Sequence, residues 1–193
     1  MPARLVQHWV YGGFLAGLLL LALTPVLAWD WPIALTCIFL AMPVYMLHQF
    51  EEHDDDRFHR EVTRLIGKGR DVLPSPAIFV INVPLVWGLN AISFALGAQD
   101  LGWGLIALYT MVANVFVHVM PALITRRYNP GLATALIFFL PLGLFGTWQI
   151  MASTSVTALQ HGVALALAIG AHLAIVGYAL ANRRLLTASG PIS

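Results

Sequence analysis

Six apolar runs of about 20 residues constrain this chain more than any other feature, because that is the length an α-helix needs to cross a bilayer. The composition agrees, since 59% of the residues are hydrophobic and only 10% are charged, against about 25% charged in soluble domains. The pattern predicts an all-α fold, a polytopic membrane helix bundle, in a single six-span domain covering residues 1–193. The expected transmembrane spans are Trp9 to Ala28, Trp31 to Phe50, Ala77 to Leu96, Leu101 to Leu123, Gly131 to Met151, and Val156 to Ala181.

The distribution of basic residues predicts the orientation of the bundle. All ten lie before the first span, between the second and third, after the fourth or after the sixth, and the other three connections carry none. Because short cytosolic loops are enriched in Lys and Arg, we expect both termini in the cytosol. The basic residues are Arg4, Arg57, Arg60, Arg64, Lys68, Arg70, Arg126, Arg127, Arg183 and Arg184.

An amphipathic helix is expected on the cytosolic side after the second span, within residues 53–70. On a helical wheel, one side carries the apolar residues and the other the basic residues; these are Phe58, Val62, Leu65 and Ile66 opposite Arg57, Arg60, Arg64 and Lys68. One interpretation is an interfacial helix that binds the anionic lipids of the inner leaflet. The other is a helix packed on the bundle. The net charge of +1 and the lack of a basic, aromatic patch give no indication of nucleic-acid binding.

The second span ends in a concentration of ionisable side chains, His48-Gln49-Phe50-Glu51-Glu52-His53. In a helix, His48, Glu51 and Glu52 fall at positions i, i+3 and i+4 and therefore face the same way. The spacing is similar to the H-x-x-E-H pattern of inverted zinc peptidases, in which the outer residues bind the metal and the glutamate is the general base. It predicts His48 and Glu52 as metal ligands and Glu51 as the catalytic base.

A third ligand must come from another helix, and His118 is the best candidate. It lies about five residues, or ~8 Å, inside the cytosolic end of the fourth span, at the depth of the motif. Two histidines and one glutamate leave a fourth position open to water, as in catalytic zinc sites. We therefore expect a divalent metal, with zinc favoured and iron as the alternative. The single cysteine, Cys37, lies roughly 16 Å along the helix from His48, too far to take part.

Other polar residues within the spans are further candidates, because polar side chains inside a membrane are costly and often functional. We expect Asn82, Asn114 and His172 in the inner half of the bundle, where they could join the site. His161 falls near the outer end of the sixth span and is expected to stay apart from them.

Three residues after the motif could also contribute. Asp55 and His59 would continue the face of His48 and Glu52 if the helix is unbroken, and they could then form part of a second metal site. His53 points about 140° away from His48 on that helix, so we consider it a candidate proton donor rather than a ligand.

On these residues the chain resembles the HXXEE family of predicted bacterial integral membrane proteins, named for His48-x-x-Glu51-Glu52. The similarity extends to Asn114-x-x-x-His118 and to Arg127-Tyr128-Asn129-Pro130-Gly131. The resemblance implies a multi-span helical protein of the bacterial inner (plasma) membrane with a suspected metal site, and it implies no established activity. A more distant similarity is to intramembrane CAAX-processing proteases, whose paired glutamates are followed by an arginine that falls one place late here, at Arg57.

Three functions are compatible with these residues. The leading hypothesis is an integral-membrane metalloenzyme, a zinc-type hydrolase acting on a lipid or membrane-associated substrate at the cytosolic leaflet. The second is a di-iron oxygenase or desaturase-like enzyme, which needs roughly six or more ligands. The third is a small proton- or metal-coupled transporter, in which Glu51 and Glu52 carry protons. The Gly13-x-x-x-Gly17 spacing would let another helix approach closely and is compatible with a homo-oligomer.

Overall fold

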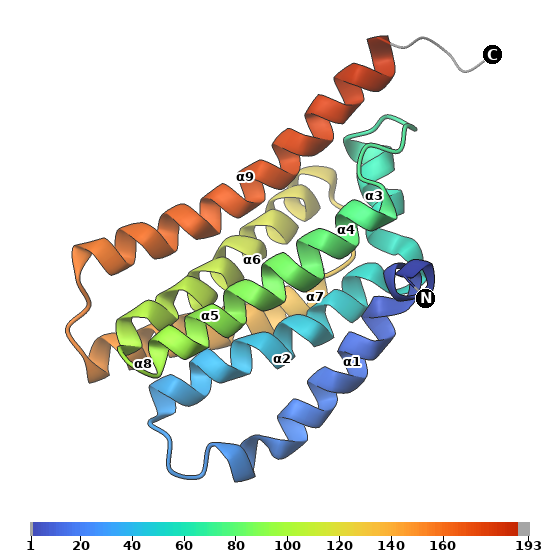
Figure 1. Ribbon diagram of the computed structural model, residues 1–193. Coiled ribbons are helices and arrows are strands. Elements are labelled where there is room, and N and C mark those ends of the chain that lie inside the picture. The colour runs from blue at the N-terminus through green and yellow to red at the C-terminus, as the bar shows by residue number, and fades with distance from the viewer. Residues whose placement is uncertain (1, 189–193) are drawn as a thin grey trace.

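The structure, a computed structural model, describes residues 2–188 as helices joined by short loops, with no strand in this part of the chain (Figure 1). Six helical segments are long and apolar enough to cross a membrane. The protein is therefore an all-α, multi-pass membrane protein, as its apolar runs predict. The six segments are Ala3–Leu27, Ile33–Leu65, Ser75–Gly97, Leu101–Thr125, Leu132–Ser153 and Ala158–Ala188.

Several of these segments contain more than one helical element. The elements are α1 (Pro2–Leu27), α2 (Ile33–His53), η1 (Asp54–Asp56), α3 (Arg57–Leu65), α4 (Ser75–Val80), η2 (Ile81–Trp87), α5 (Gly88–Gly97), η3 (Leu101–Gly104), α6 (Leu105–Thr125), α7 (Leu132–Thr134), η4 (Ala135–Phe139), α8 (Leu140–Ser153) and α9 (Ala158–Ala188). The elements η2 and η4 are π-helical turns. Pro84 lies within η2 and has no N–H to donate, so the regular hydrogen-bond ladder cannot pass through it unchanged.

The second span lies at the centre of the bundle. Its helix α2 packs against α1, α5, α6 and α8. The main core forms around Ile38 of α2, Leu108 and Met111 of α6, and Phe139 and Ile150 of the fifth span, all of them buried. Because α2 is surrounded by other helices, polar side chains near its C-terminal end face protein instead of lipid.

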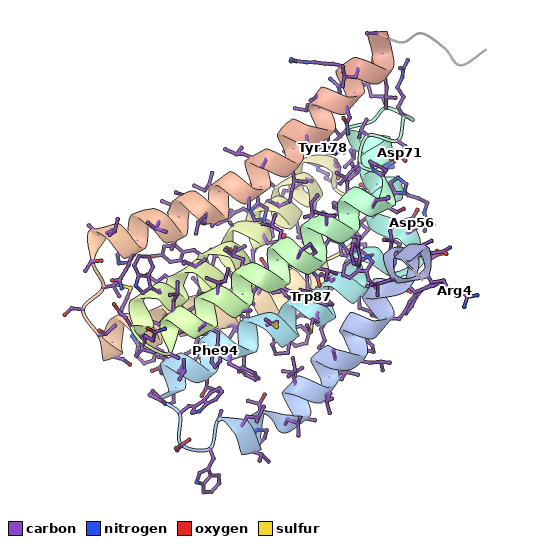
Figure 2. The ribbon with its side chains drawn as sticks, in the orientation of Figure 1. Arg4, Asp56, Asp71, Trp87, Phe94 and Tyr178 are labelled. Carbon is purple, nitrogen blue, oxygen red and sulfur yellow. The ribbon has the colours of Figure 1, made fainter. Side chains whose placement is uncertain are left out.

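Charged side chains gather at one end of the bundle, which we call the charged end. Figure 2 shows Arg4, Asp56 and Asp71 there, with Phe94 toward the opposite end. Arg183, near the C-terminal end of α9, donates to a backbone carbonyl just after α3 (3.2 Å). The beginning of α1, the last turns of α9, and α3 therefore share this end.

The chain changes direction between α2 and α3. In the turn η1, Asp55 and Asp56 have φ values of 53° and 56°, a left-handed conformation that aspartate tolerates better than most residues. The helix is therefore broken here, and the residues that follow do not continue the face that carries the motif.

The amphipathic helix α3 packs on the bundle, which is the second of the two interpretations of its sequence. Val62 is buried, and Phe58 and Ile66 pack against a cluster that contains Trp9 and Ile78. The arginines of α3 pair with nearby carboxylates; the pairs are Arg57–Asp54 at 2.7 Å, Arg60–Asp55 at 3.0 Å and Arg64–Glu61 at 2.6 Å. Binding of this helix to anionic lipids stays a prediction.

The two small residues of the first span allow close packing within the chain. A Cβ atom at Gly13 would lie 2.9 Å from the ring of Trp87, and one at Gly17 would lie 2.9 Å from side-chain atoms of Met46 and Leu47. The two glycines therefore allow α1 to pack closely against α2 and η2. That the protein forms a homo-oligomer stays a prediction.

Candidate metal centre

His48 and Glu52 lie one turn apart near the C-terminal end of α2, as their spacing predicts. The Nε2 atom of His48 is 3.7 Å from Oε2 of Glu52. Both side chains are buried, and glutamate is rarely buried unless it is paired. The pair therefore needs a compensating group nearby.

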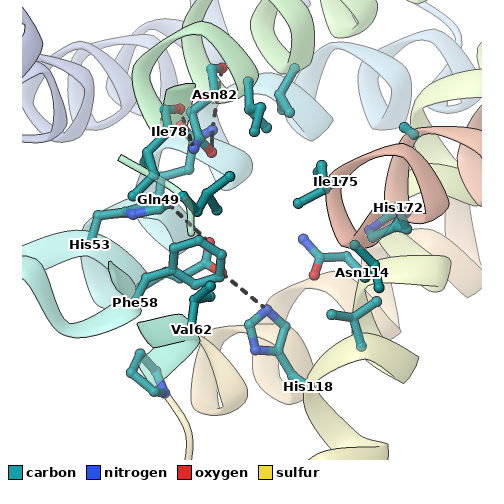
Figure 3. A pocket seen from close by; sticks show the side chains of 18 of the residues that line it. Gln49, His53, Phe58, Val62, Ile78, Asn82, Asn114, His118, His172 and Ile175 are labelled. Carbon is teal, nitrogen blue, oxygen red and sulfur yellow. Dashed lines mark hydrogen bonds and ion pairs between the residues drawn. The ribbon is translucent and has the colours of Figure 1, made fainter. Parts of the chain in front are cut away.

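The fourth span supplies His118 to the same place. Its Nε2 atom lies 3.8 Å from Oε1 of Glu52, a contact drawn as a dashed line from His118 in Figure 3. One nitrogen from each imidazole and one carboxylate oxygen all lie within 4.8 Å of one another. Within residues 2–188, this is the one group of His, Cys, Asp and Glu side chains with metal-binding spacing. We call it the three-ligand cluster.

Asn129 fixes the orientation of His118. Its Nδ2 atom donates to the backbone carbonyl of His118 (2.7 Å), so its Oδ1 atom faces Nδ1 of the same histidine at 2.8 Å. An amide oxygen only accepts, so Nδ1 must carry the ring proton. The lone pair of His118 is therefore on Nε2, the atom that points into the cluster.

Thr134 fixes the orientation of His48 in the same way. Its hydroxyl donates to the carboxylate of Glu51 and lies 2.8 Å from Nδ1 of His48. The hydroxyl has one proton, which it donates to Glu51. Its oxygen therefore accepts the hydrogen bond from Nδ1–H of His48. The Nε2 atom of His48 is thus left as the atom with a lone pair, and it faces Glu52. Such outer partners are typical of metal-binding histidines.

Glu51 lies behind the cluster and contacts the start of the fifth span. Its carboxylate accepts backbone N–H bonds from Ala133 (3.1 Å) and Thr134 (2.7 Å), and hydroxyl bonds from Thr134 and Tyr128. The free N–H groups at the beginning of a helix favour a carboxylate. Glu51 therefore joins α2 to α7, and its only link to the cluster among these bonds passes through Thr134 to His48. Its role as general base stays a prediction.

Tyr128 is held as a donor to this carboxylate. Burial, followed by the hydrogen bond to Glu51, raises the pKa of Tyr128 to about 12. The phenol therefore keeps its proton at neutral pH and continues to donate.

Gly131 lets the loop before the fifth span approach the two imidazoles. A Cβ atom at this position would lie 2.6 Å from Cε1 of His118 and 2.8 Å from Cε1 of His48. The residue also has a φ of 92°, which only glycine adopts without strain. Glycine is thus required here both by its backbone conformation and by the space available.

The donor set of the cluster fits a bound cation. In the tautomers set by Asn129 and Thr134, both Nε2 atoms present lone pairs to the carboxylate of Glu52, and neither donates to it. The Nε2 atom of His118 is buried without a hydrogen-bond partner, a costly state for a polar atom. In a tetrahedral site with bonds of about 2.0–2.2 Å, ligand atoms lie roughly 3.3–3.6 Å apart. The two histidines lie 3.7 and 3.8 Å from different oxygens of Glu52, and one donor atom from each residue lies within 4.8 Å of the others, so a bound metal would draw the three side chains slightly closer together. A divalent metal would satisfy all three side chains.

The other candidates for this region lie at different places around the cluster. His53 points away from His48, but its Nε2 atom lies 3.3 Å from Oε2 of Glu52, and its ring packs between Trp9 and Phe58. It is therefore next to the cluster without belonging to the three-ligand group.

Asn82 belongs to a neighbouring polar network on the third span. Its Oδ1 atom accepts from the side chain of Gln49 (2.9 Å), and its own amide donates to the carbonyl of Ile78 (2.9 Å). Gln49 in turn accepts from the indole N–H of Trp87 (2.7 Å). This network fixes α2 against the third span.

Asp55 and His59 lie outside the cluster, because the turn at η1 breaks the helix. Asp55 is exposed and pairs with Arg60. The two ring nitrogens of His59 contact Asp56 (2.9 Å) and Asp71 (2.8 Å). A second metal site that includes Asp55 and His59 required an unbroken helix, and the helix is broken at η1.

Asn114 and His172 face a pocket beside the cluster. Figure 3 shows both on the wall of the pocket opposite Gln49 and His53. The amide nitrogen of Asn114 lies 3.5 Å from Nε2 of His48, and His172 donates from Nδ1 to a carbonyl of its own helix (2.7 Å). They line the same cavity as the cluster. His161, by contrast, contacts the hydroxyl of Tyr109 (2.7 Å) and belongs to no such group.

Sequence reasoning missed the residues that orient the ligands, Asn129, Gly131 and Thr134. The first two lie in the Arg127-Tyr128-Asn129-Pro130-Gly131 element, which the sequence analysis used only for the family resemblance. The sequence therefore pointed to this run of residues, but it gave no indication that the run contacts both imidazoles. Nothing in the sequence singled out Thr134.

One family model, described as a protein of unknown function with an HXXEE motif, matches residues 39–146. This match spans more than half of the chain and includes the three-ligand cluster as well as Asn129, Gly131 and Thr134. No curated protein and no solved structure matches the chain. The chain belongs to the family of proteins of unknown function with an HXXEE motif.

Proposed function

We propose that this protein is a membrane-embedded metalloenzyme, a zinc-type hydrolase that acts on a lipid or membrane-associated substrate at the cytosolic leaflet. The observation that carries the proposal is the buried three-ligand cluster of His48, Glu52 and His118. Two histidines and one carboxylate are a ligand set of catalytic zinc sites, which keep one position open. The same set also holds non-haem iron.

The residues around the site would have different roles in binding the metal, orienting its ligands and excluding water. A metal in this site supplies Lewis-acid activation of water and of the group under attack. His48, Glu52 and His118 would hold it, and Asn129 and Thr134 keep both imidazoles in the tautomer that binding requires. Burial of the cluster excludes bulk water from the reacting groups.

Glu51 has two proposed roles, and one variant separates them. As a general base, Glu51→Gln should keep the metal and reduce turnover by roughly 10²–10⁴-fold. As a residue that orients His48 through Thr134, the same change should weaken metal binding by about 10–100-fold. The hydrogen bonds of Glu51 favour the second outcome. A variant with unchanged turnover and unchanged metal affinity would remove both roles.

The number of ligands favours one metal over two. A di-iron enzyme would need further carboxylates and histidines, and the structure places Asp55 and His59 with other partners. A proton-coupled transporter would need no metal, yet the cluster has the arrangement of a ligand set.

We further propose that the charged end faces the cytosol and that the membrane is the bacterial inner membrane. Support comes from the ten basic residues, which all fall in the two connections and the two terminal segments expected on one side of the spans. Single cysteines introduced by Lys68→Cys and Gln99→Cys should react from opposite sides of the membrane. Labelling of both from outside the cell would contradict this orientation.

The direct test of hydrolysis uses the purified protein in bilayers of bacterial polar lipids. With zinc added, wild-type protein should release hydrolysis products that mass spectrometry detects, and a chelator should stop the release. His118→Ala should be inactive, whereas His161→Ala, the matched histidine outside the cluster, should remain active. Release that persists in His118→Ala, or no release by zinc-loaded wild-type protein, would reject the proposal.

A further inference from the structure

The cluster lies on the wall of a cavity of about 220 Å³. Residues from α2, α3, the third span, α6 and α9 line it, and most of them are apolar. Phe58 and Val62 of α3 form its wall toward the charged end. The packed face of α3 therefore covers the cavity from the side of the charged residues.

The cavity opens toward the side of the bundle. Leu85, Val117 and Val176 line it, and they have exposed fractions of 46%, 46% and 42%. They belong to η2, α6 and α9, all within membrane-spanning segments. An opening bordered by exposed apolar side chains at this position faces lipid chains instead of water.

The charges around the cavity restrict the head group of an occupant. None of its lining residues within 2–188 is Lys or Arg, and Glu52 and Glu61 are both among them. Sites that transfer phosphoryl groups use Arg, Lys or metal clamps on the phosphate oxygens. Apart from the proposed metal, this cavity offers neutral donors, chiefly the carboxamide of Asn114 beside His48.

From the opening, the volume and the missing basic residues, we infer that the cavity binds one acyl chain of a neutral carboxylic ester, drawn from the bilayer between η2, α6 and α9. This inference rests on the proposed function and narrows its substrate from any lipid to an acyl ester. The volume is below the ~300–1,000 Å³ of pockets for drug-sized ligands, so it fits a single chain and excludes a folded peptide segment.

The reaction of such a substrate balances with water alone. The oxygen of one water forms a bond to the carbonyl carbon, and the bond from that carbon to the ester oxygen breaks. One proton of the water goes to the departing alkoxide, which leaves as an alcohol, and the acyl chain leaves as a carboxylic acid. Asn114 is placed to donate to the carbonyl oxygen, where negative charge develops.

The test uses a long-chain fatty acid methyl ester that carries a photoreactive diazirine at the far end of its chain. It is added to the full-length protein in nanodiscs, illuminated, and the labelled residues are mapped by mass spectrometry. We expect labelling around Leu85, Val117 and Val176. Ala171→Trp, which fills the cavity from α9, should reduce it about tenfold or more. Leu173→Trp, on the same helix but exposed and outside the cavity, should not.

Competition tests the head group. Unlabelled methyl ester should displace the probe, whereas an alkyl phosphate of equal chain length should not. Equal displacement by the phosphate, or labelling that survives both Ala171→Trp and the narrowing variant Val117→Phe, would overturn the inference. Metal content is measured on the same samples. Site-specific labelling of a protein that binds no metal would reject the hydrolase and leave the chain-binding cavity standing.

Discussion

The two ends of the bundle both contain buried or half-buried polar side chains, but these are satisfied in different ways. At the end away from the charged residues, Gln160 donates to Asp100 (2.8 Å) and accepts from the backbone N–H of Thr157 (2.8 Å). His161 and Tyr109 contact each other at 2.7 Å. Donors and acceptors match in these contacts, and the network needs no further partner.

At the charged end, the side chains of the cluster do not satisfy one another's hydrogen-bonding groups. The Nε2 atoms of His48 and His118 face Glu52 as acceptors, and Nε2 of His118 has no partner. The outer nitrogen of each histidine is satisfied, by Thr134 or by Asn129, and Nε2 of His48 has only the amide nitrogen of Asn114, at 3.5 Å, as a donor. The comparison indicates that burial alone does not distinguish a structural polar network from a ligand site. The distinguishing feature is a group of three buried side chains, His48, Glu52 and His118, that face one another with acceptor atoms and do not donate to one another.

The largest effect is expected from Gly131→Ala. The new Cβ atom would meet both imidazoles, and the positive φ adds strain, so zinc affinity should fall by about 100-fold, the upper end of the range for residues that support metal ligands. Gly162→Ala is the control at the other end, since a Cβ there has nothing within 4 Å and alanine favours a helix by about 0.5–1 kcal/mol. Competition titration with a zinc chelator measures both. Equal affinity in the two variants would contradict the close approach of Gly131.

A smaller effect is expected from Asn129→Ala. The change removes the acceptor of His118 Nδ1–H without touching a ligand, and the loss of such a partner typically weakens metal binding by about 10–100-fold. Asn90 is a matched buried amide that donates only to a carbonyl of its own helix. Asn90→Ala should therefore leave zinc affinity unchanged. If it weakens binding as much as Asn129→Ala does, general destabilisation would be the better explanation.

The smallest effect is expected from Thr134→Val, at the lower end of the same range, or about tenfold. Valine keeps the shape of the side chain but removes the hydroxyl between Glu51 and His48. Thr134→Ser should restore wild-type affinity, because it returns the hydroxyl. Thr157→Val, at the opposite end, should leave zinc binding alone. A serine variant as weak as the valine variant would show that the methyl group, not the hydroxyl, matters.

The six spans could be predicted because hydrophobic length alone constrains a membrane helix. The pairing of His48 with Glu52 could be predicted because helical periodicity fixes which residues of one helix share a face. His118 could be predicted as the third ligand because its depth in the membrane matches that of His48 and Glu52. Periodicity does not determine how a neighbouring helix is rotated, or where a loop folds back. For this reason the contacts of Glu51 with Thr134 and of Gly131 with both imidazoles could not be predicted.

The break at η1 had no clear signal either. Three consecutive aspartates suit a solvated helix as well as a turn, and the structure shows two of them in the left-handed region. The sequence predicted the apolar side of α3 correctly, but it did not determine whether that side contacts lipid or protein. In the structure this side packs against Trp9 and Ile78, and binding of the helix to anionic lipids stays a prediction.

The most direct test of the central claim is the number of metal ions bound per chain, measured by elemental analysis of protein purified in mild detergent without chelators. We predict one divalent ion in the wild type, none when His48, Glu52 or His118 is replaced by alanine, and one in His161→Ala. Two ions per chain would support the di-iron enzyme instead. No metal in the wild type, or full metal content in His118→Ala, would contradict the three-ligand cluster as a metal site.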